Sequence, residues 1–260
     1  MSRRRLHRTL GGVTCQEGIE GYKERIYDYP KELMITVEKT LMAVKSRESK
    51  FKFIGGVSSL DFVNTVGGRR KSAKTSREQD YQAAIRDERL DEYADLLAWS
   101  KKSGLLSEGE VKILKRKAKE EPKAAEAVLK RAVKLREAVY RLFKAAIEDW
   151  QPDVADVNRL NEELLLARKH ENLVFDRSGL RFEWKNGGMS LDKVLWMLAQ
   201  SAADILTSEK LSRVKQCAGD NCGWIFLDMS RSGNRTWCDM KDCGNLAKVH
   251  RFRGKRTVEH

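Results

Sequence analysis

The sequence lacks three features that would each assign it quickly to a class of protein. It contains no run of about eighteen apolar residues, which is roughly the length a membrane-spanning helix needs. Its basic first residues, MSRRRLHR, are not followed by the apolar stretch of a secretion signal. The phosphate-binding pattern GxxxxGK(S/T) is also absent. We therefore expect a soluble protein of the cytoplasm that binds no membrane.

Histidine is scarce, and its four copies show no catalytic pattern. None of them forms an HExxH pair, and none lies beside an obvious nucleophile. The carboxylates are scattered with the spacing of ordinary helix-surface residues. We therefore expect that the protein is not an enzyme.

Charge is abundant and unbalanced. The 260 residues include 51 Lys and Arg against 38 Asp and Glu, a formal net charge of +13. Apolar residues make up 41% and charged residues 34%, as in soluble globular proteins. A basic surplus favours polyanionic partners such as nucleic acids, although a basic surface without a partner has the same composition.

Four of the five cysteines lie in two matched pairs near the C-terminus. Cys217 and Cys222 enclose four residues, as do Cys238 and Cys243, and fifteen residues separate the pairs. Thiolates are soft ligands that suit Zn²⁺, and two short loops can present four sulfurs to one tetrahedral ion. Four thiolates leave no position for water or substrate, so we predict one structural zinc site. The alternatives are two disulfides, an iron–sulfur cluster or unrelated thiols.

The residues around the cysteine pairs predict a β-hairpin and a helix. Residues 223–228 have the composition of a strand, and the turn-rich residues 230–234 lead to a returning strand at residues 235–237. After the second pair, Asn245 can cap a helix that runs to about Arg253.

A module of about fifty residues buries little hydrophobic core, so the metal should supply much of its folding free energy. We expect Cys222→Ser or Cys238→Ser to unfold the chain from about residue 214 onward and to leave the remainder folded.

These C-terminal residues resemble the CGNR zinc-finger family, named after its last Cys-Gly-Asn-Arg. The matching positions are Cys217, Cys222, Trp224, Phe226, Asp228, Ser230, Arg231, Arg235, Trp237, Cys238, Met240, Cys243, Gly244, Asn245 and Lys248. Leu246 stands where the family has arginine, which removes one cation from the binding helix that the resemblance implies. Family members carry the finger behind a helical domain called ABATE, and residues 51–66, FKFIGGVSSLDFVNTV, resemble its start. The resemblance implies a bacterial transcription regulator, often described as stress-induced.

We expect a mainly α fold with a small β-hairpin. An N-terminal extension, residues 1–50, precedes a helical domain, residues 51–206. A zinc-ribbon-like or treble-clef-like module with a basic C-terminal helix and tail fills residues 207–260.

Within the helical domain the pattern is helical from Tyr81 to Ile147. Ser107 begins a capping box, and Pro122 suits the first turn of a long helix. The apolar face of that helix is Val128, Ala132, Leu135, Val139, Leu142 and Ala146. The charges on its remaining surface, which include Arg136 and Arg141, are expected to face solvent. Residues 173–184 alternate like a hairpin.

Basic residues of the finger predict contact with DNA. The candidates are Arg231, Arg235, Lys248, Arg251, Arg253, Lys255 and Arg256. Such residues neutralise phosphates, which gives affinity more than sequence specificity. The alternative is a zinc-stabilised module that binds another protein and no DNA.

Asp61 and Asn64 are candidate ligand contacts within the helical domain. They lie in a predicted helical turn, residues 60–65, in which Asp61, Asn64 and Thr65 form a polar group beside an apolar one. A small-molecule effector would meet them if the domain senses a signal. The other interpretation is that both side chains cap and tie the turn. The sequence leaves the effector, the DNA site and the oligomeric state open.

Overall fold

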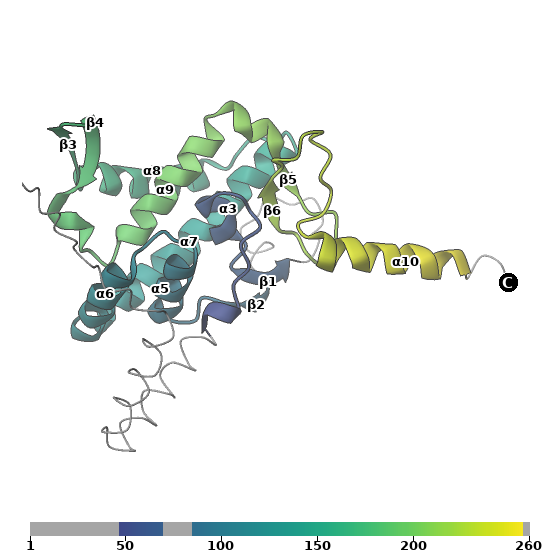
Figure 1. The fold of residues 1–260 in the computed structure, drawn as a ribbon, viewed down its shortest axis with the longest axis horizontal. Helices are drawn as coiled ribbons and strands as arrows, with labels where there is room; N and C mark the ends of the chain where they lie inside the picture. The colour runs from purple at the N-terminus through teal and green to yellow at the C-terminus, as the bar shows by residue number, and fades with distance from the viewer. Residues whose placement is uncertain (1–46, 70–84, 257–260) are drawn as a thin grey trace, which may run out of the picture. The chain divides into compact units, whose positions relative to one another are not determined.

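The computed structural model describes residues 47–69 and 85–256, with most side chains as far as Arg251. One compact unit begins at Arg47 and includes both the helices and the zinc module. It is mostly helical, and its described strands form three antiparallel pairs (Figure 1). No described helix has both the length and the apolar composition needed to cross a membrane. The predicted extension, with Cys15, lies outside the described residues as far as residue 46.

The elements follow one another in a simple order. They are α3 (Ser58–Val63), β1 (Val66–Arg69), β2 (Ile85–Glu88), α5 (Tyr93–Lys102), α6 (Glu108–Glu120), α7 (Pro122–Ile147), α8 (Val154–Lys169), β3 (Glu171–Asp176), β4 (Gly179–Trp184), η1 (Lys185–Gly188), α9 (Lys193–Leu206), η2 (Glu209–Arg213), β5 (Val214–Gln216), β6 (Ile225–Leu227), η3 (Met240–Gly244) and α10 (Asn245–Arg256).

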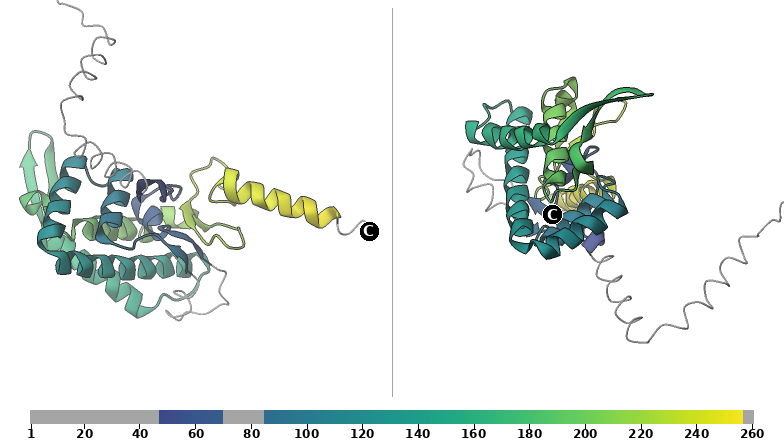
Figure 2. Two further views of the ribbon diagram at one scale, coloured as in Figure 1. Left: turned by 90° about the horizontal axis from the view of Figure 1, so that it is seen from below. Right: turned by 90° about the vertical axis from the view of Figure 1, so that its left-hand side faces the viewer.

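Helix α7 is the central element of the helical body and packs against α5, α6, α8 and α9 (Figure 2). Pro122 occupies its first turn, where the missing N–H has no partner to lose. The predicted apolar face is buried at Val128, Ala132, Leu135, Val139 and Leu142, whereas Ala146 is exposed.

Local capping signals place the ends of the helices around α7. The Ser107 hydroxyl accepts the Glu110 N–H at 3.3 Å, and the Glu110 carboxylate accepts the Ser107 N–H at 2.7 Å, which closes the predicted capping box of α6. Asp153 caps α8 through the N–H of Ala155 at 2.8 Å. Gly104 follows α5 with a φ of +75°, the left-handed conformation of a C-terminal glycine.

The strand pairing differs from the prediction in two places. Residues 66–69 pair as β1 with β2, and β2 falls in the stretch expected to be helical. In the zinc module β6 pairs with β5, and not with residues 235–237. The observed pairing buries Val214, Ile225 and Leu227 in the main hydrophobic core. This burial stabilises the pairing of β5 with β6, and the local composition of strands and turns does not predict it.

Two charged residues of α7 enter the core instead of facing solvent. Arg136 is fully buried, and its guanidinium donates to both carboxylate oxygens of Glu88 at 2.6 and 2.7 Å. Arg141 is also buried and pairs with Asp156 at 2.5 and 2.7 Å. The expectation of a solvated face is therefore wrong at these positions, because their acidic partners lie on other elements.

Glu137 joins this buried charge network to β1. Its carboxylate accepts two hydrogen bonds from Arg69, at 2.6 and 3.0 Å, and one from Arg136 at 2.8 Å. Burial raises the pKa of Glu137, but the pairing with Arg69 and Arg136 outweighs it and holds the pKa below its usual value. The carboxylate is therefore ionised between two buried guanidinium groups.

We predict that Glu137→Gln destabilises the protein by about 3–5 kcal/mol, because it leaves two buried guanidinium groups without their shared counter-charge. Urea unfolding followed by circular dichroism measures the loss. Glu126→Gln on the same helix is the control: Glu126 pairs with Lys130 at the surface, and its loss should leave the urea midpoint unchanged. Equal midpoints for the Glu137 variant and the parent would contradict the role assigned to the network.

Candidate metal centre

The four paired cysteines meet at one point. Their sulfur atoms lie within 4.8 Å of one another, with Cys222 and Cys243 each 3.5 Å from Cys238. A tetrahedron of sulfurs at about 2.3 Å from a zinc ion has edges of about 3.8 Å. The four cysteines form no disulfide, so the arrangement fits one structural Zn²⁺.

A hairpin and a helix N-terminus present the two pairs. Cys217 follows β5 and its N–H donates to the carbonyl of Trp224 at 2.8 Å, so the first pair lies in the turn between β5 and β6. The second pair frames η3, and α10 begins at the next residue, Asn245. This is the treble-clef-like arrangement that the sequence predicted, although a different strand completes the hairpin.

Hydrogen bonds and like charges set the electrostatics of the sulfurs. The thiol of Cys222, the thiol of Cys238 and nearby backbone N–H groups hold the pKa of Cys217 below its usual range. The nearby sulfur of Cys217 is the main reason that the pKa of Cys238 is raised. Four sulfurs at this spacing cannot all ionise unless a cation balances them, and a divalent zinc ion supplies that balance.

A line of hydrogen bonds joins the zinc module to the helical body. As residue numbers rise from 55 to 69 on one side, they fall from 227 to 222 on the other, so the two segments run antiparallel. The contacts are Gly55–Leu227, Asn64–Ile225, Val66–Trp224 and Arg69–Cys222, with donor–acceptor distances of 2.8 to 3.0 Å. We call these four contacts the seam.

Asn64 and Asp61, the two candidate ligand contacts, both lie at the seam. The Asn64 amide donates to the carbonyl of Ile225 at 2.8 Å and accepts its N–H at 3.0 Å, as a neighbouring strand would. The Asp61 carboxylate accepts the N–H of Gly55 at 2.7 Å, and the carbonyl of Gly55 in turn accepts the N–H of Leu227. Both side chains thus hold backbone in place, and contact with a small molecule stays a prediction.

Two glycines let the backbones approach at the end of the seam. A Cβ added to Gly68 would lie 2.5 Å from the carbonyl oxygen of Asn221. Gly223 has a φ of +62°, and a Cβ there would lie 2.8 Å from the Cβ of Arg69. Any other residue at either position would push the first cysteine pair away from β1.

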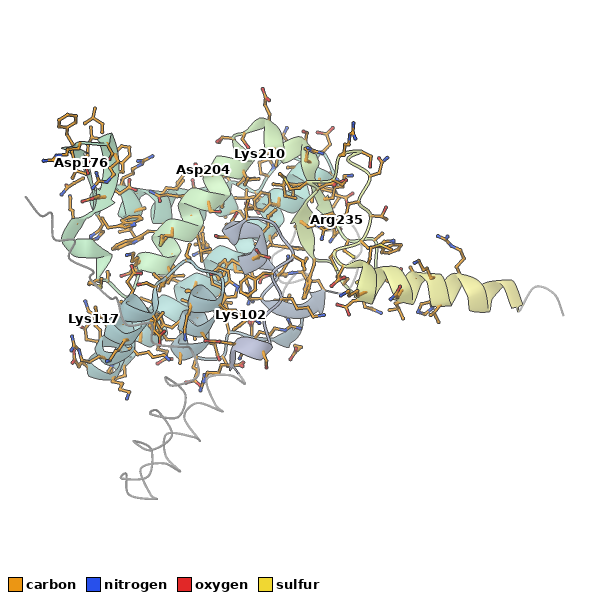
Figure 3. All side chains as sticks on the ribbon, in the orientation of Figure 1. Lys102, Lys117, Asp176, Asp204, Lys210 and Arg235 are labelled. Carbon is orange, nitrogen blue, oxygen red and sulfur yellow. The ribbon has the colours of Figure 1, made fainter. Side chains whose placement is uncertain are left out.

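The predicted DNA-binding residues fall into three groups. Arg231, Lys248 and Arg251 are exposed. Arg235, labelled in Figure 3, is half-buried. It lies over the ring of Phe226 and donates to carbonyls within the zinc module and to that of Ile54. Arg253, Lys255 and Arg256 continue α10, but their side chains lie outside the described residues.

Asp228 organises the loop that carries Arg231, a role that sequence reasoning missed. It is fully buried, and its carboxylate accepts hydrogen bonds from both the N–H and the hydroxyl of Ser230, at 3.0 and 2.6 Å. The other carboxylate oxygen accepts from Lys215 and from the N–H of Arg235, both at 2.8 Å. The Asp-x-Ser spacing is a turn signal that could have indicated part of this.

Two protein-family models match the sequence in consecutive segments. The model named ABATE, described as "Putative stress-induced transcription regulator", matches residues 56–209. The model of the CGNR zinc finger matches residues 213–256. Neither is a family of enzymes. No curated protein matches the sequence.

The shared core changes the expected consequence of losing a zinc ligand. Because β5 and β6 contribute to the main core, we predict that Cys222→Ser loses its metal and lowers the melting temperature of the helical body as well, by at least about 10 °C. Elemental analysis and thermal melting followed by circular dichroism measure both. Cys15→Ser, which removes the one unpaired cysteine, should keep one zinc per chain and melt like the parent. A Cys222 variant whose helices melt like the parent would contradict the shared core.

We also predict a dependence of stability on pH that originates at Asp61. Burial raises its pKa to about 6, although the N–H groups of Gly55 and Ile54 lower it. An acid whose pKa is higher in the folded chain costs stability as it ionises, so stability falls as pH rises through this range. Asp61→Asn can still accept the N–H of Gly55 but cannot ionise. Relative to this variant, the parent should lose roughly 1 kcal/mol between pH 5 and 7 in urea unfolding. Parallel profiles for the two proteins would rule out the effect.

Proposed function

The chain belongs to the ABATE family and ends in a CGNR zinc finger, and from this membership we propose that it is a DNA-binding transcription regulator. In this proposal the zinc finger contacts duplex DNA, and the helical domain senses a signal or mediates association. The metal is structural and holds the contacting residues in place.

Helix α10 provides the observation that carries the proposal. Its residues, 245–256, include five Lys and Arg and no acidic residue. Lys248 and Arg251 are exposed, and so are its apolar residues Leu246, at 58%, and Val249, at 44%. A helix with so little of its surface covered gains little stability from packing, so a partner that covers it is expected. The charge of the helix favours a polyanion.

The two sides of α10 differ in their surroundings. Leu246, Ala247 and His250 line a cleft of about 520 Å³ beside the zinc site, whose other wall includes Lys52 and Arg89. Helical spacing puts Lys248 and Arg251 together on a different side of the helix. An arginine in place of Leu246, as in the family, would therefore lie on the cleft side. The surface left for phosphates is the side with Lys248 and Arg251.

The loop after β6 supplies a further exposed cation. Arg231 is exposed at that loop, which Asp228 ties down through Ser230. Arg235 instead donates to carbonyls, including that of Trp237 at 3.0 Å, so its role in the proposal is to hold the module together. Among the residues with described side chains, we propose that Arg231, Lys248 and Arg251 contact the DNA phosphates.

A cavity in the helical body supports the sensing part of the proposal. It lies between α5, α6 and α7 and measures about 680 Å³, within the usual range of small-molecule sites. Tyr93, Leu97 and Leu129 give it apolar walls, and its charged lining residues are of both signs, with Lys112 and Lys119 among the basic ones and Glu92 and Glu126 among the acidic ones. A small apolar effector with charged or polar groups suits this cavity better than it suits Asp61 and Asn64, which are occupied at the seam.

A second function is favoured by the apolar residues of α10. Leu246 and Val249 are large and exposed, as in a helix that binds a protein groove. In that case the zinc module is a protein-interaction module without DNA binding.

We predict that Lys248→Ala with Arg251→Ala weakens binding to duplex DNA of every sequence. Each phosphate contact that is lost should reduce the magnitude of the slope of log affinity against log salt concentration by about 1. The slope of the double variant should therefore be smaller in magnitude than that of the parent by about 2. Titration of a labelled duplex at several salt concentrations gives both the affinity and the slope.

The matched control is Lys123→Ala with Lys134→Ala on α7, which also removes two exposed positive charges, but from another surface. It should bind DNA like the parent. If both double variants bind equally well, or if the parent does not bind at low salt, DNA binding fails and the protein-interaction function takes its place.

A further inference from the structure

The β3–β4 hairpin carries large apolar side chains that the fold leaves exposed. Phe175 is 80% exposed, Leu180 69%, Phe182 61% and Leu173 58%. The hairpin follows α8, and the ribbon views show it extending beyond the ends of α8 and α9 (Figures 1 and 2). No third strand pairs with it among the described residues.

The register of the strands puts these four side chains on one face. Leu173 pairs with Phe182, and Phe175 pairs with Leu180, so the two cross-strand pairs follow each other along the same face. The opposite face carries polar and charged residues and one apolar residue, the half-buried Val174. There the guanidinium of Arg181 forms ion pairs with Asp176 and Glu183, so its charges are balanced within the hairpin.

The hairpin contacts the helical body toward its base, where the guanidinium of Arg168 on α8 lies over the ring of Phe182. The Trp184 ring lies 5.5 Å from that of Trp196 on α9, and His170 stacks on Trp196 at 4.1 Å. A two-stranded hairpin is marginally stable in water, and a contiguous exposed apolar face on a soluble protein marks an interaction site. The apolar face therefore calls for a partner that the chain alone does not provide.

The base of the hairpin also has a cleft. It measures about 480 Å³ and is lined by Phe182 and Trp184 of β4 and by Met197 of α9, with acidic Glu183 and Asp204 among its other residues. Asp176 in Figure 3 marks the far end of the hairpin, and Asp204 marks the stretch of α9 at the cleft.

The far end of the hairpin complements its base. Phe175 supplies an apolar group there, and Arg177 in the turn is exposed and has no ion pair among the described residues. An apolar ring next to a cation fits an apolar cleft next to Asp204, an exposed carboxylate of α9. When one end of a surface is complementary to its other end, two copies of that surface can pair about a two-fold axis.

We propose that a second copy of this chain covers the hairpin and that the protein is a homodimer. The apolar faces stack in opposite directions, so the far end of each hairpin lies over the base of the other. Phe175 and Arg177 of one copy reach the cleft of its partner. The four apolar side chains expose on the order of 500 Å² per copy, so their burial in both copies approaches the ~1,200 Å² of a small specific interface before the cleft is counted.

This inference does not depend on DNA binding. A nucleic acid is a poor occupant of the face, because the exposed side chains are apolar and the charges on the reverse side are paired. The dimer would give a DNA-binding protein two zinc fingers, but its formation is tested without DNA.

Sedimentation of the full chain over a range of concentrations tests the dimer. We expect the parent to reach twice the mass of the chain, and Phe175→Thr with Leu180→Thr to raise the dimer dissociation constant at least about tenfold. Threonine suits a strand, and both side chains are exposed in the monomer, so the melting of the variant at low concentration should match that of the monomeric parent. Val154→Thr, at an equally exposed position (69%) at the start of α8, is the control and should dimerise like the parent.

Amide hydrogen exchange of the unaltered chain gives a second measurement that needs no variant. Residues 171–184 should gain protection as the concentration rises, while β5 and β6, which lie on the side of the unit away from the hairpin (Figure 1), should not change. A parent that stays monomeric at all concentrations, a double variant that dimerises like the parent, or protection that does not vary with concentration would each overturn the proposal.

Discussion

The paired hydrogen bonds between the Asn64 side chain and the backbone of Ile225 are the constraint on which the zinc module depends. β6 pairs with β5 along one edge. Along its other edge, the N–H and carbonyl of Ile225 would be buried without hydrogen-bond partners if the Asn64 side-chain amide were absent. A buried backbone group without a partner costs about as much free energy as a lost hydrogen bond. The Asn64 amide therefore replaces the hydrogen bonds that a neighbouring strand would make. Because α3 is buried between α7, α9 and β6, the position of Asn64 is set by the helical body.

Buried charges secure the other end of the same seam. The guanidinium of Arg69 pairs with Glu137 and lies 3.9 Å from the ring centre of Tyr140, whose hydroxyl donates to the carbonyl of Gly223 at 3.1 Å. The N–H of Arg69 donates to the carbonyl of Cys222. The first cysteine pair is therefore held by the core of α7 as well as by the metal. Zinc fixes the local geometry of the loops, and the seam fixes where those loops lie.

The sequence predicted what depends on neighbouring residues and missed what depends on distant ones. The capping box at Ser107, the first turn at Pro122 and the cysteine pairs are local signals, and the structure confirms each of them. The burial of Arg136 depends on Glu88, 48 residues away, and the partner of Asn64 lies 161 residues away. Nothing in a short window identifies such partners. The strand that completes the zinc hairpin was missed for the same reason, because residues 235–237 have strand-like composition but bury less core than β5.

If the zinc module and the helical body fold as one unit, zinc release and the loss of the helices must coincide. Urea unfolding would be followed at equilibrium by far-ultraviolet circular dichroism and, in parallel, by a coloured chelator that reports released zinc. We expect both signals to follow one transition with the same midpoint, because the seam and the shared core must break together. Release of zinc at a clearly lower urea concentration, with the helices still folded, would show that the zinc module unfolds as a separate unit.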